Sequence, residues 1–168
     1  MNHDRTRSRT APGRRGVGQR AQLATSADRP GAARAVSCAD PAQRGRDDAR
    51  RLFGDTVHLH ERRADMLADD LDAVFVLTPD DAHTEPALFF LQAGVAVFVE
   101  KPLAVDLTDC DRVLDTAARS RARLRVGHNL RHPPVLRRMR RLVDDGAIGR
   151  VRAVWCRHFV GHGGDHSF

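Results

Sequence analysis

The sequence has no tyrosine, one tryptophan, three cysteines and no long apolar run. A helix that spans a membrane needs roughly 20 consecutive apolar residues, whereas the longest apolar stretches here, such as residues 73–77, have only the length of a strand. The three cysteines are odd in number and widely spaced, which argues against a disulfide framework or a zinc knuckle. Because no apolar segment of a secretory signal follows the first residues, we expect a cytoplasmic protein.

Lysine is nearly absent, since Lys101 is the only lysine among 28 basic residues. Residues 1–34 contain eight arginines and two aspartates, so they carry the whole formal net charge of +6 and the rest of the chain is neutral in sum. Residues 1–15 have no large aliphatic side chain after Met1, which predicts a disordered basic arm. The arm also has no aromatic residue for base stacking, so we expect neither a nucleic-acid nor a membrane partner.

From residue 34 onward, short apolar runs alternate with amphipathic stretches, which is the rhythm of βαβ units. Several runs are apolar on both faces of the pleat, as in strands that helices cover on both sides. The pattern predicts an α/β fold with a doubly wound, mostly parallel sheet. The expected strands are 33–38, 56–60, 73–78, 95–100 and 124–127, and the expected helices are 41–53, 62–68, 83–93 and 108–120.

The pattern changes after Gly127. Residues 133–145 predict an amphipathic helix that ends at Gly146, and residues 151–160 predict a strand. We therefore expect a nucleotide-binding domain at 16–130 and, at 131–168, the truncated beginning of a second α/β domain.

Residues 16–21 match the G-x-G-x-x-G/A pattern, with Gly16, Gly18 and Ala21 in the small-residue positions. In a dinucleotide-binding turn such residues let the backbone approach a pyrophosphate. The alternative is that residues 16–21 belong to a flexible linker rich in glycine and arginine. Asp40 follows the first expected strand, where a carboxylate accepts hydrogen bonds from the adenosine ribose and favours NAD over NADP; nearby arginines weaken that preference. Capping of the helix that begins at Pro41 is the alternative role of Asp40.

Two loops follow neighbouring buried strands. The first holds Thr78, Pro79 and His83, and the second holds Glu100 and Lys101 before a proline. Ligands bind at the carboxyl ends of strands in open α/β sheets, and a lysine there can transfer a proton at a carbinol oxygen while hydride leaves the carbon. The alternatives are an ordinary strand-to-helix turn and an exposed lysine paired with a glutamate.

The chain carries Thr78-Pro79 with His83, then Ala-Gly-Val-Ala-Val-Phe-Val-Glu-Lys-Pro-Leu-Ala at 93–104, Val-Gly-His-Asn-Leu-Arg-His at 126–132 and Gly-Ala-Ile-Gly at 146–149. In order and spacing these segments resemble the Gfo/Idh/MocA oxidoreductase family. The resemblance implies a Rossmann-type domain and hydride transfer between NAD, or NADP, and a sugar, polyol or related hydroxy compound. Members of this family are longer than this chain, and their second domain supplies the usual surface for a homo-oligomer.

Carried over residue by residue, the resemblance makes Lys101 the catalytic lysine, which also lies against the cofactor. It places Thr78, Pro79, His83 and Glu100 along the cofactor, Gly16, Gly18 and Ala21 under its pyrophosphate, and Asp40 on its ribose. Asn129 and Arg131 would stand near the substrate. The alternative is a catalytically incomplete fragment that binds a nucleotide or a partner. No metal site is expected, because the glycine-rich end near Cys156 fixes no ligand geometry.

Overall fold

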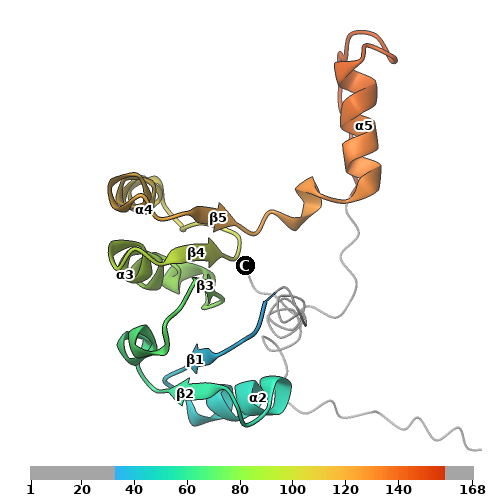
Figure 1. Cartoon of the computed structure of the whole chain (residues 1–168). Helices are drawn as coiled ribbons and strands as arrows, with labels where there is room; N and C mark the ends of the chain where they lie inside the picture. Colours follow the sequence, from blue (N-terminus) through green and yellow to red (C-terminus); the bar gives the residue numbers. More distant parts are fainter. Residues whose placement is uncertain (1–32, 158–168) are drawn as a thin grey trace, which may run out of the picture.

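A computed structural model describes residues 33–157 of the chain (Figure 1). The expected basic arm and the glycine turn at Gly16, Gly18 and Ala21 lie outside the described residues, as does the end of the chain from residue 158.

The described part begins with a pair of short parallel strands. β1 (Ser37–Ala39) pairs with β2 (His58–His60), with Ser37 opposite His58. The helix α2 (Gln43–Phe53) connects them and is followed by Gly54 at its C-cap. Gly54 has a positive φ of 82°, which glycine adopts without the steric strain that a side chain would cause. This is the βαβ unit that the alternating pattern predicts.

The second sheet has three parallel strands. β3 (Ala73–Val76), β4 (Ala96–Val99) and β5 (Leu124–Val126) pair in that order. The crossover helices are α3 (Thr84–Gln92) and α4 (Leu107–Ser120), which begins where the Asp106 carboxylate accepts a hydrogen bond from the amide of Asp109. Parallel strands require such crossovers, and the predicted α/β class is confirmed.

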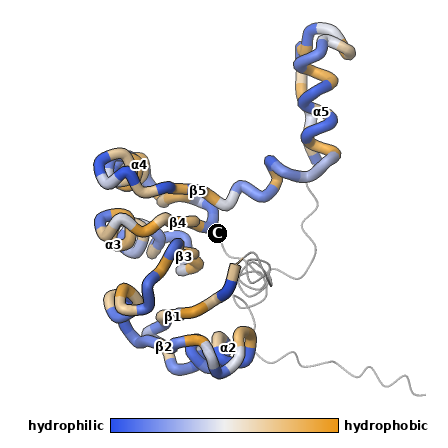
Figure 2. Tube along the Cα trace, viewed as in Figure 1, coloured by the Kyte–Doolittle hydropathy of each residue, from blue (hydrophilic) through white to orange (hydrophobic). Residues whose placement is uncertain are grey.

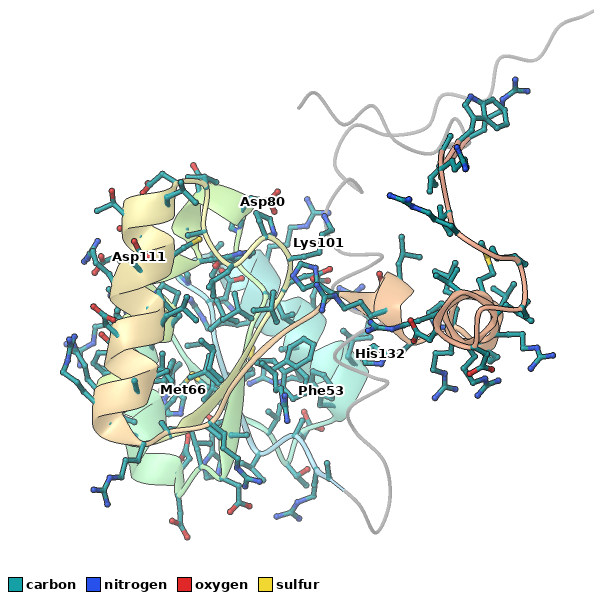
Figure 3. All side chains as sticks on the ribbon, turned by 90° about the horizontal axis from the view of Figure 1, so that it is seen from above. Phe53, Met66, Asp80, Lys101, Asp111 and His132 are labelled. Atoms are coloured by element: carbon teal, nitrogen blue, oxygen red, sulfur yellow. The ribbon has the colours of Figure 1, made fainter. Side chains whose placement is uncertain are left out.

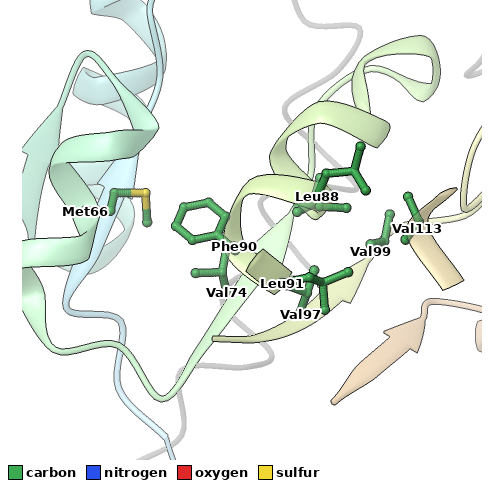
Figure 4. Packing of buried hydrophobic residues seen from close by; sticks show 10 residues of the cluster. Met66, Val74, Leu88, Phe90, Leu91, Val97, Val99 and Val113 are labelled. Carbon is green, nitrogen blue, oxygen red and sulfur yellow. The ribbon is translucent and has the colours of Figure 1, made fainter. Parts of the chain in front are cut away.

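The core lies between one face of this three-stranded sheet and the helices α3 and α4 (Figure 4). Alternate residues of a strand point to one face. On β3 and β4 these are four valines, and they pack against fully buried residues of α3, among them Phe90 and Leu91, and against Val113 of α4. The buried valines are Val74, Val76, Val97 and Val99.

The opposite face is less covered among the described residues. Phe75 is 41% exposed, and its ring lies 5.0 Å from that of Phe98, centroid to centroid. The apolar runs predict that both faces of the sheet are buried. Within residues 33–157, only the face that α3 and α4 cover is buried. The residues ahead of Gly16, where a doubly wound sheet has its central strand, lie outside the described residues. Within residues 33–157, β1–β2 and β3–β4–β5 are two separate parallel sheets.

Two local predictions were wrong. Residues 62–68 do not form an α-helix but a 3-10 helix, η1 (Arg63–Asp69), which ends at Asp70 in the left-handed region. Residues 151–157 are not a strand, because a strand needs a hydrogen-bonded neighbour and none pairs with them in the described part of the chain. The remaining residues of that expected strand, 158–160, lie outside the description.

The helix α5 (Pro134–Asp144) projects away from both sheets (Figure 1), and none of its residues is buried. Figure 2 shows apolar and polar residues mixed along it, and its apolar side chains include Val135 and Met139, which are 64% and 56% exposed. An amphipathic helix normally buries such a stripe. Among the helices of residues 33–157, none has the length and apolar content that crossing a membrane requires.

A carboxylate joins η1 to the first strand pair. Asp69 lies 2.6 Å from His58 Nδ1 and 2.6 Å from His60 Nε2. The Ser37 hydroxyl beside it and these two rings hold the pKa of Asp69 well below its usual range. Because Ser37 Oγ has no hydrogen bond of good geometry within the described residues, we assign the larger effect to the two histidines.

Replacing Asp69 tests this cluster. We expect Asp69→Asn to lower the free energy of unfolding by about 1–2 kcal/mol at pH 7, since one charge-assisted bond is lost. A lowered native pKa stabilises the fold above the unfolded value near 4 and loses that effect as pH falls below it. The difference between wild type and variant, measured by urea denaturation, should therefore shrink from pH 7 to pH 3.

The control for this experiment is Asp55→Asn, because Asp55 pairs with Arg50 while its side chain is 93% exposed. Exposed pairs contribute little, so the control should stay near wild type at both pH values. A constant difference for Asp69→Asn across the pH range would contradict the assignment.

Candidate functional site

The first loop of the candidate site follows β3. Thr78 Oγ1 donates a hydrogen bond to the carbonyl of Ala82 at 2.9 Å, and the amide of Ala82 donates to the carbonyl of Pro79 at 2.8 Å. These bonds close a single 3-10 turn, η2 (Asp80–Ala82), ahead of α3. Thr78 and Pro79 thus stand at the carboxyl end of a buried strand, where the sequence predicts them.

The second loop follows β4, the neighbour of β3. The amide of Glu100 donates to the carbonyl of Val76 at 3.0 Å, which continues the strand pairing by one residue. The Glu100 carboxylate contacts the amide of Lys101, and the Lys101–Pro102 peptide is cis. Lys101 is exposed and has no ion pair within residues 33–157. Figure 3 shows Lys101 and Asp80, one from each loop, at the same end of the domain.

His83 connects the two loops. Its side chain is 1% exposed, with Nε2 3.0 Å from the carbonyl oxygen of Thr78 and Nδ1 2.6 Å from that of Pro102. The sequence places His83 along the cofactor, and this role stays a prediction. In the described structure both of its ring nitrogens face main-chain oxygens of the loops.

Gly127 belongs to the site although the sequence assigns it no role. It follows β5, and a Cβ atom there would lie 2.8 Å from Glu100 Oε2 and 3.1 Å from the Phe98 ring. A side chain at this position would displace the Glu100 carboxylate and press on the Phe98 ring, so glycine allows both to stay where they are. A glycine directly after an apolar strand was the available signal.

Asp40 follows β1, as predicted, and caps the turn before α2. Its Oδ1 accepts a hydrogen bond from the amide of Ala42 at 2.8 Å, and a Cβ at Gly45 would overlap the carboxylate. Asp40 therefore closes a local turn ahead of α2, whereas the N-cap residue of the helix is Ala42 and receives no side-chain cap, so the helix-capping alternative is not seen. Arg46 donates to the main-chain oxygen of Asp40 at 2.6 Å, so this guanidinium is tied to the loop, and the ribose-binding role stays a prediction.

Cys38 in β1 lies next to this turn. Burial raises the pKa of its thiol, and the negative charge of Asp40 adds to the rise. A raised pKa keeps the sulfur neutral at physiological pH and makes it a poor nucleophile. Cys38 is therefore not a candidate nucleophile.

Asn129 and Arg131 form the single 3-10 turn η3 (Asn129–Arg131) after β5, and both are exposed. Arg131 lines a shallow pocket along β5, whereas Asn129 does not. The pocket is lined by Leu124, Arg125, Val126, His128, Arg131 and His132. Its basic character suits an anionic or strongly polar group, and the substrate roles of Asn129 and Arg131 stay predictions.

The arrangement at the ends of β3, β4 and β5 offers a hydroxyl (Thr78), a carboxylate (Glu100) and an ammonium (Lys101) to a ligand. Parallel strands deliver these groups to one edge because all their carboxyl ends point the same way. Such a set can bind a polar cofactor and move a proton. Among residues 33–157, no group of three histidine, cysteine or acidic side chains is placed to hold a metal ion.

Comparison with known proteins agrees with this geometry. A family model described as an oxidoreductase family with an NAD-binding Rossmann fold, Gfo/Idh/MocA, matches residues 15–128. Inositol 2-dehydrogenase from Rhizobium meliloti is 39% identical over 87 residues, which cover 52% of this chain and 26% of that protein.

Two solved structures resemble the fold. The WlbA dehydrogenase from Bordetella pertussis, in complex with NADH and UDP-GlcNAcA, has a TM-score of 0.73 and 26% identity, covering 80% of this chain and 42% of that one. The scyllo-inositol dehydrogenase from Lactobacillus casei, with bound NAD(H) and scyllo-inositol, has a TM-score of 0.70 and 26% identity, covering 83% and 40%.

The chain thus spans between about a quarter and about two fifths of the length of these relatives. The family match nevertheless covers most of the chain and includes both loops of the candidate site. The chain therefore belongs to the Gfo/Idh/MocA oxidoreductase family, with an NAD-binding Rossmann domain matched at residues 15–128.

Proposed function

We propose that the chain forms the nicotinamide-binding part of an oxidoreductase that transfers a hydride between NAD, or NADP, and a hydroxy compound such as a polyol or sugar. The observation that carries the proposal is Lys101, the only lysine of the sequence, which stands exposed at the carboxyl end of β4 beside the loop of Thr78. The names of the relatives, inositol dehydrogenases among them, support the substrate class.

The residues present fit a dinucleotide. Asp40 follows β1, where a carboxylate binds a ribose in this fold class, and Thr78 and Pro79 follow the carboxyl end of β3. The Glu100 carboxylate lies beside Gly127 and contacts the amide of Lys101. When bound, the nicotinamide supplies or accepts the hydride.

Lys101 moves the proton. In the direction of reduction, the ammonium donates its proton to the substrate carbonyl oxygen as hydride reaches the carbon, which yields the alcohol and a neutral amine. In the direction of oxidation, the neutral amine takes the hydroxyl proton as hydride leaves. The carboxylate of Glu100, bound to the Lys101 amide, orients this residue. Asn129 and Arg131 are proposed to hold the distal part of the substrate.

Thermal unfolding with cofactor tests the binding half of the proposal. At a concentration about 100 times its dissociation constant, NADH or NADPH should add roughly 2.7 kcal/mol of stability and raise Tm by a few degrees. Asp40→Asn should weaken binding of NADH more than that of NADPH, because the carboxylate repels a 2′-phosphate. If neither dinucleotide changes Tm, the proposal is wrong for this chain.

A second candidate is nucleotide binding without turnover. In this candidate Asp40 and Thr78 hold the nucleotide, and Lys101, which is exposed at the end of β4, transfers no proton. This candidate predicts the same rise of Tm with NADH but no change in nicotinamide absorbance at 340 nm with any polyol or sugar.

A further inference from the structure

We propose that His83 is a positioning residue: its buried ring lies between one main-chain carbonyl of each loop, fixes the loop of Thr78 to the loop of Lys101 and thereby sets where the Lys101 ammonium stands. The inference rests on the proposed role of Lys101. It assigns His83 a function that differs from cofactor contact, because its side chain is 1% exposed.

The ring of His83 contacts both loops. Nδ1 lies 2.6 Å from the Pro102 carbonyl oxygen and Nε2 lies 3.0 Å from that of Thr78. Carbonyl oxygens only accept hydrogen bonds, so a ring N–H of His83 donates to a loop carbonyl. The ring therefore ties main-chain atoms of the two loops together at one point.

The two carbonyls belong to loops that follow different strands of the sheet. Thr78 follows β3 by two residues, and Pro102 follows β4 by three, immediately after Lys101. Beyond Glu100, whose amide bonds to Val76, strand pairing between the two loops ends. Beyond this point the His83 ring, and not strand pairing, connects the two loops. Loss of the ring should therefore free the Lys101 loop.

The single lysine allows a direct test. Reductive methylation with ¹³C-formaldehyde labels Lys101 Nζ, and the only other amine is the N-terminus, so one ¹³C NMR signal reports the position of Lys101. In the wild-type chain we expect a signal that NADH shifts. In His83→Phe, which keeps a ring but has no donor, the NADH-induced shift should be lost, and hydrogen exchange of residues 101–104 should rise about tenfold, the factor of one hydrogen bond.

Two comparisons separate positioning from stability. Thr116→Val removes a buried hydroxyl that donates to the Arg112 carbonyl in α4, away from the loops. This variant should leave the Lys101 signal as in wild type. His83→Gln, with one donor group on its amide, should recover part of the shift. An unchanged signal in His83→Phe, or an equal loss in Thr116→Val, overturns the proposal.

A measurement on the wild-type chain does not depend on any variant folding. With ¹⁵N-labelled histidine, a ring N–H of His83, identified by its absence in His83→Phe, should exchange slowly with solvent, because the ring is buried and donates to a loop carbonyl. Exchange as fast as that of an exposed histidine ring would overturn the proposal. If NADH does not bind at all, the proposed function fails, yet the exchange of this ring N–H and of residues 101–104 still decides the role of His83.

Discussion

Lys101→Met should reduce the turnover of the chain by about 10²–10⁴-fold, the usual contribution of a positioned proton donor. Methionine keeps most of the length and the apolar stem of the side chain but has no proton to give. Because Lys101 is exposed and makes no ion pair within residues 33–157, its loss should leave Tm within about one degree of wild type. The measurement is the initial rate of nicotinamide oxidation or reduction with inositols and other polyols.

The matched control is Arg119→Met, which also removes one exposed cation. Arg119 lies in α4 and pairs with Asp115 at 3.9 Å, both largely exposed. This variant should retain the wild-type rate. A Lys101→Met chain that keeps its rate within tenfold would show that another group transfers the proton, whereas equal losses in both variants would indicate an effect of overall charge.

Phe90→Ala should cost about 3–5 kcal/mol of unfolding free energy, the largest stability change that we expect from a single side chain. Phe90 is 2% exposed and lies in the cluster between α3 and the sheet (Figure 4). Its ring meets that of Phe89 edge to face at 5.1 Å between centroids. Truncation leaves a cavity that the rigid strands cannot close. Domains are stable by only about 5–15 kcal/mol, so the variant should lose much of its folded population on mild heating.

Urea denaturation followed by far-UV circular dichroism measures this loss. Phe75→Ala is the control, because Phe75 is 41% exposed on the opposite face of the sheet and should cost far less. If the two variants are equally destabilised, the face of Phe75 and Phe98 contributes as much to the core of the whole chain as the face that α3 covers.

Local patterns predicted the elements well where a single physical rule operates. Alternating apolar runs located β3 and β4, because strands buried by helices are recognisable from composition alone. The 62–68 segment failed because apolar spacing does not distinguish a 3-10 turn from an α-helix. The 151–157 segment failed because strand formation depends on a partner elsewhere in the chain, which its own residues do not reveal.

The sequence alone determined the α/β class, the family and the order in which Thr78, Glu100 and Lys101 follow their strands, since these depend on residue type and spacing. The tertiary structure decided which side chains and main-chain groups contact one another across these loops. Only there does the buried ring of His83 meet the carbonyls of Thr78 and Pro102, and only there does Gly127 make room for Glu100. These contacts join segments that lie apart along the chain, and their distances follow from strand register and crossover packing, which no local pattern of residues encodes.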